Sequence, residues 1–279
     1  HLHMHRFQPP PKESNLLDIE WFPLYPTTEL GMMQMNTDTY YRLLNLGLRL
    51  AAGAGSAVGV KQSPMGYNRA YVQASADASL SEFNEAWKSG RNFVTNGPMI
   101  LLSGPRGETP GDDIQLDDAD SRLAFNLTVE SDQPLQSIEM IQDGVNVKNL
   151  EVTDPYSVKH AFELPVGTSG WVAARATARD DLLSDDELQR YDDPPRQRPS
   201  RIRFAHTSPI YIAVDGSPAG VVEAIEEGLI MLLHLEKYAE LHVQASRKDD
   251  FLAAIDRATA RLREQLSSVR GRDGKTDGP

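Results

Sequence analysis

Three histidines alternate at the start of the chain, in the order His1-Leu2-His3-Met4-His5. On an extended segment this spacing places the imidazoles on one face, about 7 Å apart along the strand. Two neutral imidazoles at that distance can share a divalent metal ion such as zinc or iron. A metal site needs further ligands from elsewhere, and no nearby carboxylate has a spacing that singles it out. The cluster therefore indicates a metal site, and an expression remnant or a frayed terminus would give the same pattern.

A run of small residues at 53–59 contains three glycines and is the second feature that bears on chemistry. It lacks the Lys-Ser/Thr ending of a P-loop and the glycine spacing of dinucleotide sites. It predicts a tight bend that lines a pocket. Candidate pocket-lining residues in and around the bend are Arg49, Ser56, Asn68 and Arg69. No nucleophile, base and orienting group can be assembled from spacing alone.

The overall composition limits the classes of partner. The chain has 279 residues, 40% of them apolar, and a formal net charge of −12, which is typical of a soluble globular protein and unfavourable for binding nucleic acid. The absence of cysteine excludes disulfides and thiolate metal sites. No apolar run is long enough to cross a bilayer. These observations disfavour a nucleic-acid partner and a membrane span, and the expected partner is a small-molecule substrate. The oligomeric state and the compartment, which could include export, are left open.

The elements that must position any site change in type along the chain, and together they predict an α+β fold. Residues 1–98 alternate loop, helix and short strand. A strand is expected at 16–22, a helix capped by Thr37 and running to about residue 48, and strands at 68–73 and 93–95. Ser79 and Glu82 have the spacing of a capping box before another helix, which Gly90 ends.

Residues 99–216 contain strand patterns and no helical one. Apolar and polar residues alternate over 122–130, and Asp143-Gly144 separates two apolar runs in the manner of a hairpin turn. Further strands are expected at 158–164, 171–177 and 210–214, with a surface loop at 180–203. Several short strands of this kind predict an antiparallel β-sandwich. The aromatic candidates for a binding face on it are Tyr156 and Trp171, and both suit a core equally well.

The C-terminal part reads as a helical pair over 217–270, followed by a disordered tail at 271–279. Ser217-Pro218 has the form of an N-cap followed by proline at the first helical position. Apolar residues then recur at helical spacing in two successive stretches, and lysine and arginine gather toward the end of the second.

Several phrases in order resemble one family, the CehA/McbA-type metallohydrolases related to the PHP phosphoesterases. The similarity covers roughly residues 36–215 and is to the C-terminal portion of these proteins. The phrases are YYRLLN at 40–45, GLRL at 47–50, GS at 55–56, GYNRAYV at 66–72, GRNFVTNGP at 90–98, PGD at 110–112 and AHTSPIY at 205–211. The resemblance implies a distorted α/β barrel followed by a β-sandwich. It also implies hydrolysis of an ester, carbamate or phosphoester bond by water activated on zinc, manganese or iron.

Two departures from the family pattern shape the functional expectation. Too few residues precede the Gly-Ser turn for a whole barrel, so residues 1–98 resemble a partial PHP-like barrel that starts midway, with His3 as the best match to a metal ligand and His1 and His5 as further candidates. Catalytic members carry an aspartate directly after the Gly-Ser turn, where this chain has Ala57. The sequence thus predicts a fragment of a metal-dependent hydrolase that has lost one metal position. The alternative is a non-catalytic member whose β-sandwich binds a partner or a glycan, or serves as structure.

Overall fold

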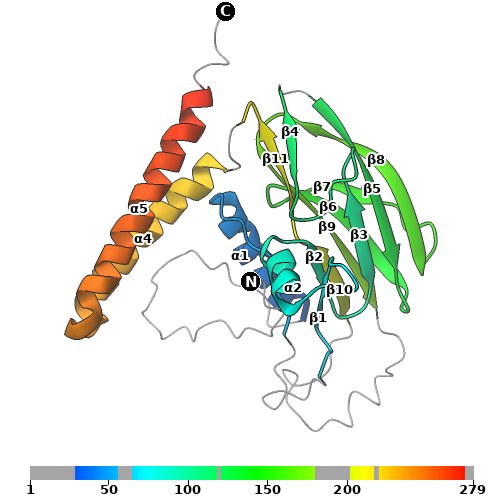
Figure 1. Ribbon diagram of the computed structural model, residues 1–279, viewed down its shortest axis with the longest axis horizontal. Coiled ribbons are helices and arrows are strands. Elements are labelled where there is room, and N and C mark those ends of the chain that lie inside the picture. Colours follow the sequence, from blue (N-terminus) through cyan, green and yellow to red (C-terminus); the bar gives the residue numbers. More distant parts are fainter. Residues whose placement is uncertain (1–28, 56–64, 118–120, 180–201, 217–219, 274–279) are drawn as a thin grey trace, which may run out of the picture.

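The computed structural model describes residues 29–55, 65–117, 121–179, 202–216 and 220–273. It has a mixed α+β architecture, with a large curved sheet, a second antiparallel sheet and a pair of C-terminal helices (Figure 1). The predicted metal ligands His1, His3 and His5, the predicted strand at 16–22, and Ser56 and Ala57 lie outside the described residues.

The large sheet has eight strands, organised around β9 (Gly170–Arg179). On one side, β9 pairs with β6 (Leu135–Gln142), which pairs with β7 (Val145–Leu150). On the other side, one half of β9 pairs with β10 (Ile202–Thr207) and the other half with β11 (Ile210–Val214). The sheet then divides: β10 continues to β2 (Asn92–Thr95) and β1 (Arg69–Val72), and β11 pairs in parallel with β4 (Asp113–Leu116).

The second sheet has three antiparallel strands, in the order β3 (Met99–Ser103), β5 (Ser121–Glu130) and β8 (Ser157–Val166). The predicted alternation in β5 is confirmed, because every second residue from Leu123 to Val129 is buried. These side chains share one hydrophobic core with Ile138 and Met140 of the large sheet. The two sheets therefore enclose a common core, as expected for a sandwich.

The other face of the large sheet is covered by α1 (Glu29–Asn45). Tyr40, Tyr41 and Leu44 form a second core there with Trp171 and its neighbours. Because β9 is covered on both faces, its first five residues are all buried. The prediction that Thr37 caps this helix is wrong: the helix begins at Glu29, and Thr37 is a buried residue within it.

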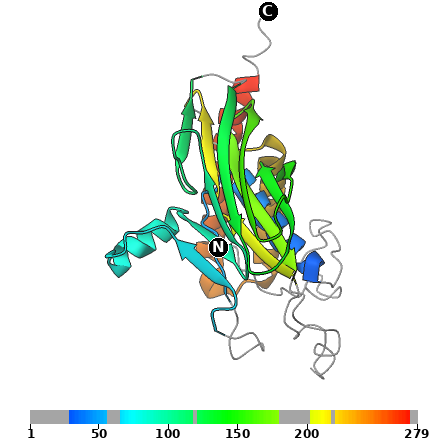
Figure 2. The ribbon, with the colours of Figure 1, turned by 90° about the vertical axis from the view of Figure 1, so that its right-hand side faces the viewer.

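Two local predictions about turns and caps are confirmed. Helix α2 (Leu80–Lys88) connects β1 to β2 and begins with a capping box, in which the Ser79 side chain accepts from the Glu82 amide and the Glu82 carboxylate accepts from the Ser79 amide. Asp143 and Gly144 connect β6 to β7 with positive φ angles of 50° and 86°, as a type I′ hairpin turn requires. The β1–α2 unit projects to one side of the sandwich (Figure 2).

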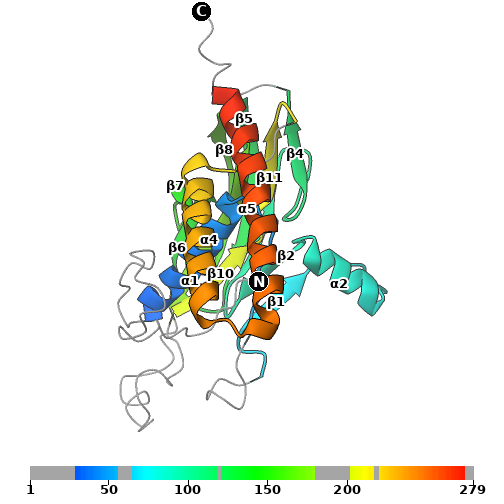
Figure 3. The same cartoon turned by 90° about the vertical axis from the view of Figure 1, so that its left-hand side faces the viewer.

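The C-terminal helices α4 (Val222–His242) and α5 (Ala245–Asp273) pack against each other as an antiparallel hairpin. Figure 3 shows them alongside α1, on the side of the large sheet that faces away from the sandwich core. The contact with the rest of the protein includes Leu46 and the backbone hydrogen bond from Val221 to Asn45. None of the helices in the described ranges is both long and apolar enough to cross a membrane.

The predicted boundary at residue 98 falls between β2 and β3, which belong to different sheets. The region before it contributes α1, which covers the large sheet, and β1 and β2, which extend that sheet through the pairing of β2 with β10. Strands β3, β4 and β10 were not expected from the sequence, although the last two residues of the predicted loop at 180–203 begin β10.

Candidate functional site

The three predicted pocket residues within the described ranges make contacts at separate places. The Arg49 guanidinium donates to both carboxylate oxygens of Asp113, at 2.7 and 3.1 Å, and lies 4.0 Å from the centre of the Tyr211 ring. Asn68 donates to the carbonyl of Gly55 at 2.8 Å. Arg69 is exposed at the start of β1, and its guanidinium lies 5.9 Å from the centre of the Tyr71 ring. These contacts hold the segment before residue 56 and the start of β1 in place.

A cycle of hydrogen bonds fixes the backbone of Ala52 against the large sheet. The Ala52 amide donates to the Ser208 hydroxyl at 2.9 Å, and that hydroxyl donates to the Asn92 side chain at 2.8 Å. The Asn92 amide group returns to the Ala52 carbonyl at 2.8 Å, and the Trp87 indole donates to the same carbonyl at 3.0 Å. Each polar group in this cycle therefore already has a hydrogen-bond partner within the protein.

His206 is the most perturbed base in the described part of the chain, and it is fully buried. Its Nδ1 lies 2.6 Å from the Thr207 carbonyl, which can only accept, so Nδ1 carries the proton and Nε2 accepts from the Tyr41 hydroxyl at 2.7 Å. Burial lowers the pKa of His206 from 6.5 to about 4. A neutral, inaccessible imidazole with both nitrogens satisfied serves the packing of α1 on the sheet.

Asp143 has the most strongly raised pKa among the carboxyl groups of the described residues. Its carboxylate accepts from the Trp171 amide at 2.9 Å and lies against Gly170, and burial raises its pKa from 3.8 to about 6. Asn45 links the same turn to α1, because it donates to the Asp143 carbonyl and accepts from the Trp171 indole. Asp143, like His206, therefore has a structural role: its contacts hold α1 against the β6–β7 hairpin.

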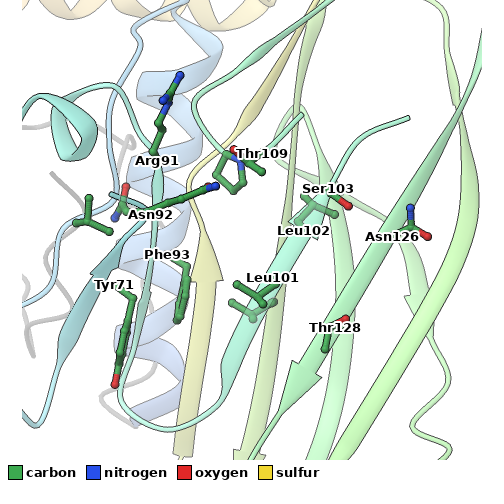
Figure 4. Close-up of a pocket in the computed structure, with 14 residues that line it drawn as sticks. Tyr71, Arg91, Asn92, Phe93, Leu101, Leu102, Ser103, Thr109, Asn126 and Thr128 are labelled. Atoms are coloured by element: carbon green, nitrogen blue, oxygen red, sulfur yellow. The ribbon is translucent and has the colours of Figure 1, made fainter. Parts of the chain in front are cut away.

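A cleft of about 490 Å³ lies where β1 and β2 extend past the edge strand β3, and it continues over the outer face of β3 and β5 (Figure 4). Its volume is within the range of small-molecule sites. One wall is a pair of aromatic rings: Tyr71 and Phe93 are directly opposite each other on β1 and β2, with ring centres 5.1 Å apart and planes inclined by 9°. Tyr71 is 37% exposed and Leu101, on the floor, is 60% exposed.

The opposite wall is polar and uncharged. Ser103 on β3 is directly opposite Asn126 on β5, and Leu101 is opposite Thr128. These side chains point outward because their neighbours along each strand fill the sandwich core. Among the described residues, the side chains of Ser103, Asn126 and Thr128 make no hydrogen bond within the protein, so all three are available to a ligand (Figure 4).

The rim is built by the loop between β3 and β4. Asp112 accepts from both the amide and the hydroxyl of Thr109 and lies 3.4 Å from the Arg91 guanidinium. Gly111 donates its amide to the Pro209 carbonyl at 2.7 Å. Arg91 is the one charged side chain among the described residues that line the cleft, and it already has a carboxylate partner.

The sequence analysis did not identify this cleft. Of the aromatic candidates that it named, Trp171 is 1% exposed in the second core, and Tyr156 is 50% exposed at the start of β8, away from the cleft. Tyr71 and Phe93 belonged to strands that were expected, but their pairing depends on a register that spacing does not reveal.

In the part of the chain that the structure describes, no three histidine, aspartate or glutamate residues gather as metal ligands do. A site with three such ligands would therefore require at least one from outside those ranges. Comparisons of the chain with protein-family models, with curated proteins and with solved structures return no match.

Proposed function

We propose that the described part of this chain is a non-catalytic binding module and that its ligand occupies the cleft between the β1–β2 extension and the β3–β5 face. The observation that carries the proposal is the combination of an exposed aromatic ring with polar side chains that lack partners in the protein. Without a ligand, exposed polar groups of this kind hydrogen-bond to water. A ligand that replaces the water is oriented by its hydrogen bonds to them.

A binding role fits the chemistry of the lining better than a reaction does. A reaction centre needs a nucleophile or a base within reach of an orienting group. The described residues of the cleft include no histidine, aspartate, glutamate or lysine. His206, whose pKa is lowered by burial, and Asp143, whose pKa is raised by burial, are held in structural contacts away from this surface.

We further propose that the chain is the C-terminal portion of a CehA/McbA-type protein, with a partial PHP-like barrel before residue 98 and a binding sandwich after it. The ordered phrases from residue 40 to residue 211 support this assignment. Ala57 supports a non-catalytic member, because a methyl group at the position of the expected aspartate cannot bind a metal ion.

Metal-dependent hydrolysis of an ester, carbamate or phosphoester is the second candidate, favoured by the alternation of His1, His3 and His5. It is tested by the zinc, manganese and iron content of purified protein, together with hydrolysis of chromogenic esters and phosphodiesters. Stoichiometric metal that is lost in the His3→Ala variant, with turnover lost in parallel, would support this candidate. Metal-free protein without turnover after zinc, manganese or iron is added would exclude it.

The binding proposal is tested by ligand-observed NMR with a diverse small-molecule library. The Leu101→Glu variant places a charge on the apolar floor of the cleft, and Val145→Glu, on the exposed β7 edge, is the matched control. We expect ligands that bind the wild type and the control but not Leu101→Glu. A library without binders, or binders that Leu101→Glu retains, would contradict the proposal.

A further inference from the structure

We infer that the ligand of the cleft is a neutral saccharide, an inference that rests on the binding function proposed above. Three properties of the cleft lead to it: a flat aromatic wall, an uncharged polar wall opposite, and a described lining whose one charged side chain, Arg91, has a carboxylate neighbour.

The aromatic wall suits the apolar face of a sugar ring. Tyr71 and Phe93 are close to parallel, and Phe93, which is almost fully buried, lies between the exposed Tyr71 and Leu101 (Figure 4). The buried ring prevents Tyr71 from turning inward, so its orientation is set before a ligand arrives. A rigid, exposed ring offers contact area at a small cost in conformational entropy. A pyranose presents C–H groups on one face, and these pack flat against such a ring.

The polar wall suits sugar hydroxyl groups. Ser103 and Thr128 carry hydroxyls and Asn126 carries an amide, so each can both donate and accept a hydrogen bond. A sugar hydroxyl also does both. Three adjacent side chains of this kind, all without partners among the described residues, match a ligand that has hydroxyls along one edge and C–H groups on its face.

The charges argue against ionic ligands. No carboxylate is among the described residues that line the cleft, so nothing there would neutralise a cationic ligand. Arg91 lies 3.4 Å from Asp112, and this neighbouring carboxylate would repel a phosphate or carboxylate ligand. A flat aromatic ligand would use the Tyr71 ring but leave the polar wall to water, and it is therefore the main competing outcome.

The experiment measures binding of tetrasaccharides of glucose, xylose, mannose and N-acetylglucosamine, and of 2-naphthol, by calorimetry and ligand-observed NMR. We expect at least one tetrasaccharide to bind and 2-naphthol to compete with it weakly. Tyr71→Ala and Asn126→Ala should each weaken the association constant by about tenfold. Tyr156→Ala removes an exposed tyrosine outside the cleft and should leave the association constant unchanged.

The outcomes separate the inference from the function on which it rests. Suppose that no saccharide binds, and that 2-naphthol binds the wild type but not Leu101→Glu. The saccharide inference is then overturned, and the proposal of a binding module remains. If neither class binds, both fail. Saccharide binding that Tyr71→Ala and Asn126→Ala leave unchanged would also overturn the inference. Thermal melting of each variant shows whether it is folded, and Asn126→Ala, on the outer face of β5, provides an independent test if Tyr71→Ala does not fold.

Discussion

Replacing Asp143 with asparagine is expected to stabilise the protein at neutral pH by up to about 3 kcal/mol. Burial against Gly170 and Trp171 raises the pKa of this carboxyl from 3.8 to about 6. Each tenfold change in a proton equilibrium corresponds to about 1.4 kcal/mol, so the charged form destabilises the fold by roughly twice that amount. Asparagine removes the charge, retains an oxygen that can accept from the Trp171 amide, and tolerates the φ of 50° at this position.

The sign of the pH dependence follows from the direction of the pKa change. Between about pH 6 and pH 4 the folded wild type binds a proton that the unfolded chain does not, so the wild type gains stability relative to the variant as the pH falls. The advantage of Asp143→Asn should thus be complete above pH 6 and disappear near pH 4. Urea unfolding of both proteins at intervals from pH 4 to pH 8 measures it directly.

Asp215→Asn is the matched control, because Asp215 also precedes a glycine and also has a φ of 50°, but is exposed. Any benefit of asparagine for a left-handed backbone appears in both variants, and only Asp143→Asn removes a buried carboxylate. Equal gains in the two variants, or a gain in Asp143→Asn that is the same at every pH, would refute the reasoning about burial.

Three further predictions concern stability, each measured by urea unfolding. Burial lowers the pKa of His206 to about 4, so the wild type should lose stability as the pH falls. Its stability advantage over His206→Gln should shrink by about 3 kcal/mol from pH 7 to pH 4, and a constant difference would contradict this. Gly111→Ala should destabilise by about 3 kcal/mol or more, since its Cβ would lie 2.4 Å from the Ser89 carbonyl oxygen. Gly107 has a similar φ but open space around it, so Gly107→Ala should lose only the stability that backbone strain costs. Equal losses of stability in the two variants would be inconsistent with the clash. Ser79→Ala removes the capping box of α2 and should cost about 1 kcal/mol, so an unchanged midpoint would argue against its role.

Features that depend on local sequence were predictable. The alternation in β5 follows from one face being buried, the Asp143-Gly144 turn from the φ angles that a tight hairpin needs, and the capping box of α2 from the spacing of Ser79 and Glu82. Each of these depends on residues within a few positions of one another, so the physical cause is contained in the segment itself.

Features that depend on how distant segments meet were not predictable. The cleft combines Tyr71 and Phe93 with Ser103 and Asn126, and only the strand pairing and the packing of two sheets bring them together. The burial of Trp171 depends in the same way on α1 docking to the outer face of the large sheet. The extents of β3, β4 and β10, which were missed, are set by their pairing with distant strands.

The most direct test of the binding function is a two-dimensional amide NMR titration of the wild type with the best ligand from the tetrasaccharide and library screens. We expect the chemical-shift changes to centre on Tyr71, Phe93, Leu101 and Asn126 and to be lost in Leu101→Glu. Changes that gather around Arg49 or the C-terminal helices, with the amides of the cleft unmoved, would contradict the assignment of this cleft as the binding site.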